Sequence, residues 1–213
     1  MNHPLVVAIT GGSGAVYAMR LLQVLLSTGR EVFLTLSPSG ADVIRQELNV
    51  DVDLSPDKFD PRPLVQYRLP WSERASEVDD DWGDRLTYAH FQNYFSPIAS
   101  GSHLTAGMIV CPCSGSTLSG IARSAGSNLI HRAAEVHLKE HRPLILVTRE
   151  TPLSVIAIEN MHRAAKAGAV MLPAMPGWYH GVKGLDDLVD FIVARILDQL
   201  KIENHLMHRW GDA

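Results

Sequence analysis

The chain has 213 residues, of which 46% are hydrophobic and 20% are charged, a balance typical of one globular α/β domain with a sizeable core. Its formal net charge of -4 and its pI near 6.2 argue against a general nucleic-acid-binding protein, which would be basic. Apolar runs stay well below the roughly 20 residues that span a bilayer, so we expect no membrane partner.

The cysteine content favours a reducing compartment. The two cysteines, Cys111 and Cys113, flank Pro112 and are too close in sequence to be good disulfide partners. Their spacing is also a weak signal for zinc, because no second pair of ligands stands nearby. We therefore expect buried, free thiols. Because the first residues, Met-Asn-His-Pro, carry no basic run, we expect no secretory signal and a cytoplasmic location.

The first quarter of the chain alternates between strand and helix patterns. Residues 5–10 are apolar and β-branched, which predicts a buried strand, and 13–27 predict a helix that ends at Gly29. A second strand is predicted over 31–36 and a second helix over 40–48. This alternation predicts an α/β fold with a single doubly wound, Rossmann-like parallel sheet flanked by helices.

Residues 49–98 interrupt this alternation. They are rich in Asp and Pro, and we expect an irregular insertion with one short strand near Val65–Leu69. A stretch of this length is often functional or forms an interface.

Regular patterns return after the insertion and continue to a C-terminal tail at 201–213. Strands are predicted over 106–110, 143–147 and 169–172, and helices over 117–123, 154–167 and 185–200, with a further helix before 143. We expect residues 1–213 to form a single domain.

Three small, hydroxyl-bearing turns indicate a ligand that carries a phosphate. Thr10–Ala15 and Ser114–Thr117 each follow a strand and open a helix, and Ser100–Ser102 is a third such turn. Glycines let a ligand approach the backbone, and a helix N-terminus favours negative charge. An alternative for the first turn is a tight connection in which Ser13 only caps the helix.

The first turn differs from the dinucleotide-binding fingerprint. Tyr17 stands where the third glycine of that fingerprint should be. Ser37, rather than an acid that would hold an NAD ribose, ends the second strand. A mononucleotide therefore fits better than NAD.

Charged side chains cluster around the predicted strand at 143–147. Arg149 and Glu150 follow this strand directly, and Arg132, Glu135 and Lys139 share one face of the preceding helix. Cations and a carboxylate that converge at a strand end suit an anionic substrate that also needs proton transfer. The alternative is an ordinary surface network of ion pairs.

Two further residues are candidates for phosphate binding. Tyr179 lies in a Pro/Gly turn and is able to donate a hydrogen bond, and Arg195 on the last helix is able to grip a phosphate, although it would also suit an exposed helix surface. Among the histidines, His137 and His141 have metal-ligand spacing on a helix, but we expect this pair to be solvent-exposed.

Several long motifs together resemble the UbiX-type flavin prenyltransferases of the homo-oligomeric flavoprotein superfamily. The resemblance covers nearly the whole chain outside 49–98. Its motifs are TGGSGA at 10–15, ASGS at 99–102, CPCSGSTLSGIA at 111–122, NLIHRAAEVHLKEHRPLILVTRETPL at 128–153, MLPAMPGWYH at 171–180, LVDFIVARILDQL at 188–200 and HRWG at 208–211.

The resemblance implies a specific reaction. The family transfers a dimethylallyl group from dimethylallyl phosphate to reduced FMN, first at N5 and then at C6, and requires no metal. The product, prenylated FMN, serves UbiD-type decarboxylases. Members assemble into dodecamers with sites between subunits, so the resemblance also implies a homo-oligomer.

The resemblance also implies a role for each matching position. The flavin turn matches Gly11, Gly12 and Ser13, with Ser13 near N5, and the other FMN contacts match Ser37, Ser114, Gly115, Ser116, Thr117 and Arg132. The residues that hold the donor's phosphate match Lys139, Arg149, Tyr179 and Arg195. Glu150 matches the residue that handles protons, and Glu47 and Trp210 match further active-site positions. We expect Ser13, Glu47 and Glu150 to be catalytic.

The chain departs from the family pattern at two places. The flavin turn reads Gly-Gly-Ser instead of Gly-Ala-Ser, and Tyr94-Phe95 stands where relatives carry a Trp facing the prenyl pocket. Two other functions are open alternatives. One is a flavin-dependent cysteine decarboxylase of the phosphopantothenoylcysteine type, which would carry a PASANT-like motif where this chain has CPCSGST. The other is a non-catalytic flavin-binding accessory subunit.

Overall fold

The computed structural model describes residues 3–69, 72 and 78–211, whose strands form one parallel sheet. The strands are β1 (Leu5–Ile9), β2 (Val32–Leu36), β3 (Leu86–Tyr88), β4 (Gly107–Cys113), β5 (Leu144–Thr148) and β6 (Val170–Met171). Their order in the sheet is β3-β2-β1-β4-β5-β6, and every neighbouring pair is parallel. This is the order of a doubly wound Rossmann-like sheet, so the predicted fold class is confirmed.

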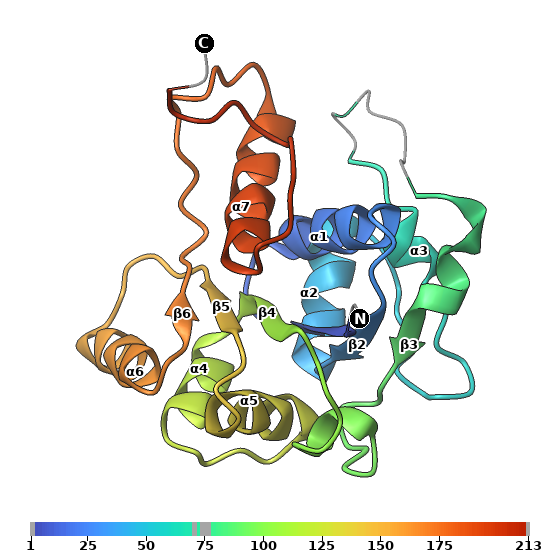
Figure 1. The fold of residues 1–213 in the computed structure, drawn as a ribbon, viewed down its shortest axis with the longest axis vertical. Coiled ribbons are helices and arrows are strands. Elements are labelled where there is room, and N and C mark those ends of the chain that lie inside the picture. Colours follow the sequence, from blue (N-terminus) through green and yellow to red (C-terminus); the bar gives the residue numbers. More distant parts are fainter. Residues whose placement is uncertain (1–2, 70–71, 73–77, 212–213) are drawn as a thin grey trace.

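Helices cover both faces of the sheet (Figure 1). One face carries α1 (Ala15–Ser27), α2 (Pro38–Leu48), α3 (Arg62–Val65) and α7 (Leu185–Gln199). The other carries α4 (Gly115–Ala122), α5 (Leu129–Lys139) and α6 (Val155–Lys166). Two short 3-10 helices are also present: η1 (Asp80–Arg85) directly precedes β3, and η2 (Pro97–Ala99) lies between β3 and β4.

The central strand β1 shows why the sequence forms this sandwich. Leu5, Val7 and Ile9 pack into the core beneath α1 and α7, whereas Val6 and Ala8 face the core beneath α4 and α5. A strand that is buried on both faces needs apolar residues at every position, which explains the unbroken LVVAI run.

The first helix begins differently from the prediction. Its N-cap is Gly14, which has φ of 106° and provides no side-chain cap, so the alternative that Ser13 caps this helix is wrong. In contrast, Ser37, Ser114 and Ser154 cap α2, α4 and α6 by accepting a hydrogen bond from a backbone N–H of the first turn.

The 49–98 segment is partly regular, and the predicted strand near Val65–Leu69 is wrong. Residues 62–65 form the short helix α3, because Pro61 and Pro63 favour a helical start and cannot donate to a strand ladder. The segment instead contributes β3, which pairs with β2 and completes one edge of the sheet. Residues 70–71 and 73–77 lie outside the described part of the chain.

The predicted exposure of His137 is also wrong, although His141 is exposed. His137 is completely buried, and its Nδ1 lies 2.7 Å from the Ala133 carbonyl oxygen. Because a carbonyl only accepts, Nδ1 carries the proton. Nε2 lies 2.9 Å from the Thr105 hydroxyl. Burial lowers the pKa of His137 to about 4, so the ring is neutral at pH 7 and Nε2 accepts the hydroxyl proton.

This buried histidine makes stability depend on pH. The pKa of His137 is about 4 in the folded chain, whereas the ordinary value for a histidine, which applies to the unfolded chain, is 6.5. The unfolded chain therefore binds more protons between these values, and stability is complete above pH 6.5. As the pH falls from 6.5 to 4, the free energy of unfolding therefore decreases by about 3 kcal/mol. The free energy of unfolding, measured with urea at several pH values between 4 and 7, should depend less steeply on pH for His137→Gln than for the parent. For His141→Gln the dependence on pH should be unchanged. Equal slopes for the His137 variant and the parent would contradict this role.

The two cysteines are buried and free, as predicted. Burial raises the pKa of Cys113 to about 12, and that of Cys111 further still, so both thiols stay protonated. In the described part of the chain, none of the helices has the length and apolar character needed to cross a membrane.

Candidate functional site

Two of the three predicted polar turns meet at the carboxyl ends of β1 and β4, where the strand order reverses. The third, Ser100–Ser102, precedes β4 and lies beside the end of α5 instead. The Thr10 hydroxyl donates to the Pro112 carbonyl oxygen at 2.8 Å and accepts from the Ser114 amide at 2.8 Å. These bonds tie the turn after β1 to the turn after β4. In doubly wound sheets, ligands bind in the crevice at this switch point.

The turn after β2 joins the same edge. The Ser37 amide donates to the Ile9 carbonyl oxygen at 3.0 Å, and the Ser37 and Ser39 hydroxyls lie 3.1 Å apart. A Cβ atom on Gly40 would lie 2.6 Å from the Ile9 carbonyl oxygen, so only glycine lets α2 pack this closely against β1. The three turns therefore present their hydroxyl and amide groups side by side.

Glu47 at the end of α2 reaches the first turn of α1. Its Oε2 accepts from the Gly14 amide at 2.9 Å and from the Ala15 amide at 2.8 Å. The carboxylate thus satisfies amides at the positive end of α1, a role that a capping side chain usually has. The sequence predicted Glu47 only through the resemblance, because its 33-residue separation from Gly14 has no local signature.

The start of α4 carries a group of hydroxyls. The Ser114 hydroxyl lies 3.1 Å from that of Ser116 and 3.0 Å from that of Thr117. Together with the first amides of α4, these hydroxyls suit a phosphate or another anionic group.

Arg149 and Glu150 leave β5 at this same edge of the sheet. Both are exposed, and they line a small cavity of about 60 Å³ with Met161 from α6 and Met175. Burial raises the pKa of Tyr17 in the first turn of α1, and the charge of Arg149 opposes this rise. The guanidinium therefore lies within electrostatic range of the turn after β1.

The expected cluster on α5 exists, but it lies on the outer side of that helix. Arg132 pairs with Glu135 at 2.9 Å, and Lys139 forms an ion pair with Glu140. The face turned to the sheet is instead apolar, apart from His137. Arg132, Glu135 and Lys139 therefore share a face of α5, as predicted. Within one chain their pairing agrees with the alternative interpretation, a network of surface ion pairs.

Lys139 does not meet Arg149 and Glu150 within one subunit, so the expected convergence is wrong for a single chain. α5 ends at Lys139, and β5 then runs in the opposite direction to Thr148. Four strand steps of about 3.3 Å separate the two ends of β5 by roughly 13 Å. Lys139 therefore lies at the amino edge of the sheet, whereas Glu150 lies at the carboxyl edge.

The C-terminal residues form a third group beside α7. The rings of Tyr179 and Trp210 meet edge to face with centroids 5.6 Å apart, although they are 31 positions apart in the sequence. Asp198 accepts bonds from Arg195 at 2.7 Å and from Arg209 at 2.8 Å. The hydrogen bond from Arg209 is the main reason why the pKa of Asp198 is lowered.

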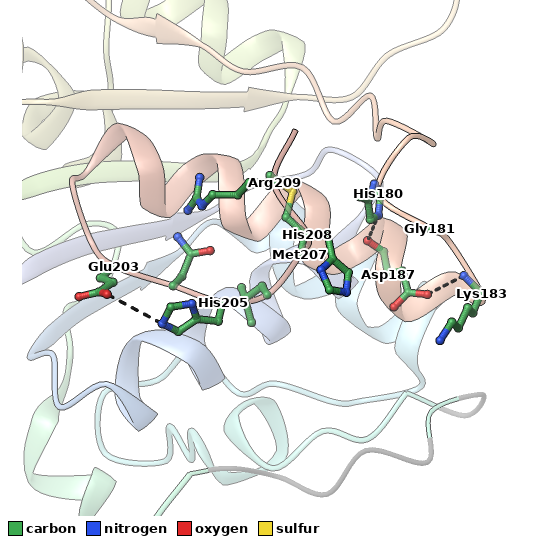
Figure 2. A pocket seen from close by; sticks show the side chains of 11 residues that line it. His180, Gly181, Lys183, Asp187, Glu203, His205, Met207, His208 and Arg209 are labelled. Carbon is green, nitrogen blue, oxygen red and sulfur yellow. Dashed lines mark hydrogen bonds and ion pairs between the residues drawn. The ribbon is translucent and has the colours of Figure 1, made fainter. Parts of the chain in front are cut away.

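A large polar cavity of about 730 Å³ lies between the tail and the start of α7. Figure 2 shows His180 and Asp187 on one side of it and Glu203 and His205 of the tail on the other. The tail thus folds back along α7 and brings Trp210 to Tyr179.

Comparison with known proteins decides the family. The Flavoprotein family profile matches residues 1–197. Flavin prenyltransferase UbiX of Halalkalibacterium halodurans is 43% identical over 209 residues, which cover 97% of this chain and 92% of that protein. Flavin prenyltransferase UbiX of Pseudomonas aeruginosa is 41% identical over 205 residues, which cover 96% of this chain and 92% of that protein. The chain belongs to the UbiX-type flavin prenyltransferases.

Solved structures agree with this membership. One match is a crystal structure of AnUbiX (PadA1) in complex with FMN and dimethylallyl pyrophosphate. The alignment covers 100% of the present chain and 100% of the AnUbiX chain, with 32% identity and a TM-score of 0.82. A dodecameric FMN-dependent UbiX-like decarboxylase from Escherichia coli O157:H7 matches with 35% identity and a TM-score of 0.77, covering 99% and 100%.

The alternative functions have weaker relatives. A PPC decarboxylase and the FMN-binding protein AtHal3 are each 12% identical, with TM-scores of 0.55 and 0.58, so they share the fold alone. Neither the cysteine decarboxylase nor the accessory-subunit alternative gains support from them.

Two sets of contacts that shape the site are not predicted by the sequence patterns. Thr10, in a predicted turn, joins that turn to the one after β4, and Asp198 accepts from Arg195 and Arg209. The spacing of Arg195 and Asp198 is an available signal for their pairing, since i and i+3 share a helix face. The role of Thr10 has no such signal, because its partners are about 100 positions away.

Proposed function

We propose that this UbiX-type chain transfers a dimethylallyl group from dimethylallyl phosphate to N5 and C6 of reduced FMN and so makes prenylated FMN. The observation that carries this proposal is the meeting of the turns after β1 and β4 at one edge of the sheet, with Glu47, Arg149 and Glu150 at the same edge. We further propose that residues 1–213 act as a single flavoprotein domain.

The residues at this edge of the sheet suit FMN. A Cβ atom on Gly12 would lie 3.2 Å from Cβ of Pro112, so glycine lets the turn after β1 pack closely against the end of β4 and brings the two turns together. Gly11, Gly12 and Ser13 would hold the flavin, with the Ser13 hydroxyl near N5. The further contacts would come from Ser37, Ser114, Gly115, Ser116, Thr117 and Arg132. When bound, reduced FMN supplies the electron-rich prenyl acceptor.

Positive side chains would hold the phosphate of the donor. Negative charge grows on the phosphate as its bond to the allylic carbon breaks, and fixed cations stabilise that charge. Lys139, Arg149 and Arg195 would supply these cations, and the Tyr179 hydroxyl would donate a further bond. Three cations replace the metal ion that prenyl diphosphates usually require, so we propose a metal-independent reaction.

Acids and aromatic rings would complete the site. Glu150 would hold or move a proton at the departing phosphate oxygen, and Glu47, at the flavin turn, would assist proton movement there. Trp210 and Tyr179 already pack together, and their rings would keep water from the developing allylic cation.

We propose that neighbouring subunits complete each site. Lys139 lies at the amino edge of the sheet, away from the turns after β1 and β4, and Arg132 on the outer side of α5 is bonded to Glu135 and to the Ala99 carbonyl oxygen. Exposed apolar residues such as Phe95 and Ile156 support an assembly that covers them. A relative with 35% identity is described as dodecameric, and we propose the same homo-oligomer here.

The product would pass to a UbiD-type decarboxylase in the cytoplasm. A cytoplasmic setting agrees with the two free, buried thiols, since disulfides are rare in reducing compartments.

Mass spectrometry of the flavin tests this function. The pure protein is incubated anaerobically with reduced FMN and dimethylallyl phosphate, with and without EDTA. We expect the flavin to gain one five-carbon unit in both samples. An unchanged flavin mass in both would overturn the proposed transfer, and product only without EDTA would overturn metal independence. A parallel sample with a cysteinyl substrate, assayed for CO₂, detects the decarboxylase alternative.

A further inference from the structure

The loop before β4, residues 99–105, lies against α5 and is held there by arginines. The Ala99 carbonyl oxygen accepts from Arg132 Nε at 3.1 Å. Arg142, just beyond α5, donates through Nη1 to the His103 carbonyl oxygen at 2.7 Å and through Nη2 to the Gly101 carbonyl oxygen. Three loop carbonyls therefore point at guanidinium groups, which fixes the path of the loop along the helix.

A buried chain of hydrogen bonds adds to this anchoring. Arg142 Nη1 also lies 3.3 Å from the Thr105 hydroxyl, which donates to the buried ring of His137. The His137 ring is in turn fixed by the Ala133 carbonyl oxygen in α5. The end of the loop is thus tied to the interior of the helix, and its backbone is a firm support for whatever packs on it.

Lys139 and Glu140 pack on this support at Gly101. A Cβ atom on Gly101 would lie 2.8 Å from Lys139 Nζ and would overlap the Glu140 carboxylate. The backbone of Gly101 does not adopt positive φ, so alanine can take the same conformation. An alanine would therefore leave the loop in place and displace only the tips of these two side chains.

We propose that Gly101 is a positioning residue for recognition of the donor's phosphate. Gly101 determines the position of the Lys139 ammonium group, and Arg142 holds the loop that contains Gly101. This inference rests on the proposed function, because it assumes that Lys139 binds phosphate in a neighbouring subunit's site. Displacement of a phosphate-binding cation by an ångström or more weakens binding strongly, since charge-assisted hydrogen bonds need short distances.

Steady-state kinetics of the full-length oligomer test the inference. We expect Gly101→Ala to raise KM for dimethylallyl phosphate about tenfold, with a smaller change in kcat and unchanged FMN binding. Gly83→Ala is the matched control, because Gly83 is exposed and a Cβ there would meet no atom within 4 Å. Light scattering establishes that each variant keeps the assembly of the parent.

A double-mutant cycle separates positioning from a general structural effect. If Gly101 acts through Lys139, Gly101→Ala should have no further effect on KM in a Lys139→Ala background. Equal effects in both backgrounds, or a parental KM for Gly101→Ala, would overturn the inference. Absence of prenylation by the parent protein would instead overturn the proposed function, so the two failures are distinct.

Discussion

Replacement of Glu150 by glutamine should lower kcat for flavin prenylation by about 100-fold to 10,000-fold, the range of general acid-base catalysis. Glutamine keeps the size and polarity of the side chain but cannot accept or release a proton at pH 7. Because Glu150 lies beyond β5, outside the three turns that would bind the flavin, FMN affinity should stay unchanged. Single-turnover flavin conversion and fluorescence titration with FMN measure the two quantities.

The matched control for this variant is Glu31→Gln. Glu31 is exposed at the start of β2, at the opposite edge of the sheet, so the same chemical change there should leave kcat unaltered. Turnover of Glu150→Gln at the parental rate would show that Glu150 does not move the proton. A loss of FMN binding together with activity would point to a structural role instead.

Mixed oligomers of two inactive variants should regain activity. Lys139→Ala and Glu150→Gln homo-oligomers should each be severely impaired. If the Lys139 of one subunit serves the crevice of another, random 1:1 assembly restores about one quarter of the sites, because each of two independent positions is intact half of the time. Co-expression with two different affinity tags, followed by tandem purification, yields the mixed particles for assay.

The reason for this expectation is the placement of Lys139 at the amino edge of the sheet and Glu150 at the carboxyl edge. If both residues served one site from the same subunit, a mixed particle would contain no intact site. Activity no higher than that of the parent variants, in particles shown to contain both tags, would therefore refute a site shared between subunits. A reassembled sample of parent and Lys139→Ala subunits checks that mixing itself does not inactivate the enzyme.

Local patterns in the sequence were sufficient for the central sheet and the turns that follow its strands. The LVVAIT run predicts a strand that is buried on both faces, since no polar residue breaks it, and β1 has this environment. Ser114 precedes a helix, and the structure shows its side chain accepting from the Thr117 amide. Such features depend on neighbours within a few residues, so the sequence encodes them directly.

Prediction failed where distant contacts override local preference. His137 has a polar side chain at metal-ligand spacing, yet burial against Thr105 decides its environment. The strand expected near Val65–Leu69 gives way to β3, which forms because it pairs with β2. Strand pairing depends on partners far along the chain, so pattern alone cannot select which short apolar segment will supply the edge strand.

The sequence by itself determined the fold class and, through its long motifs, the family and the candidate residues. Only the tertiary structure decided where those residues lie: Glu47 against the first turn of α1, Trp210 against Tyr179, and Lys139 across the sheet from Glu150. The physical reason is that periodicity fixes which face of an element a side chain occupies, whereas packing between elements fixes what that face meets.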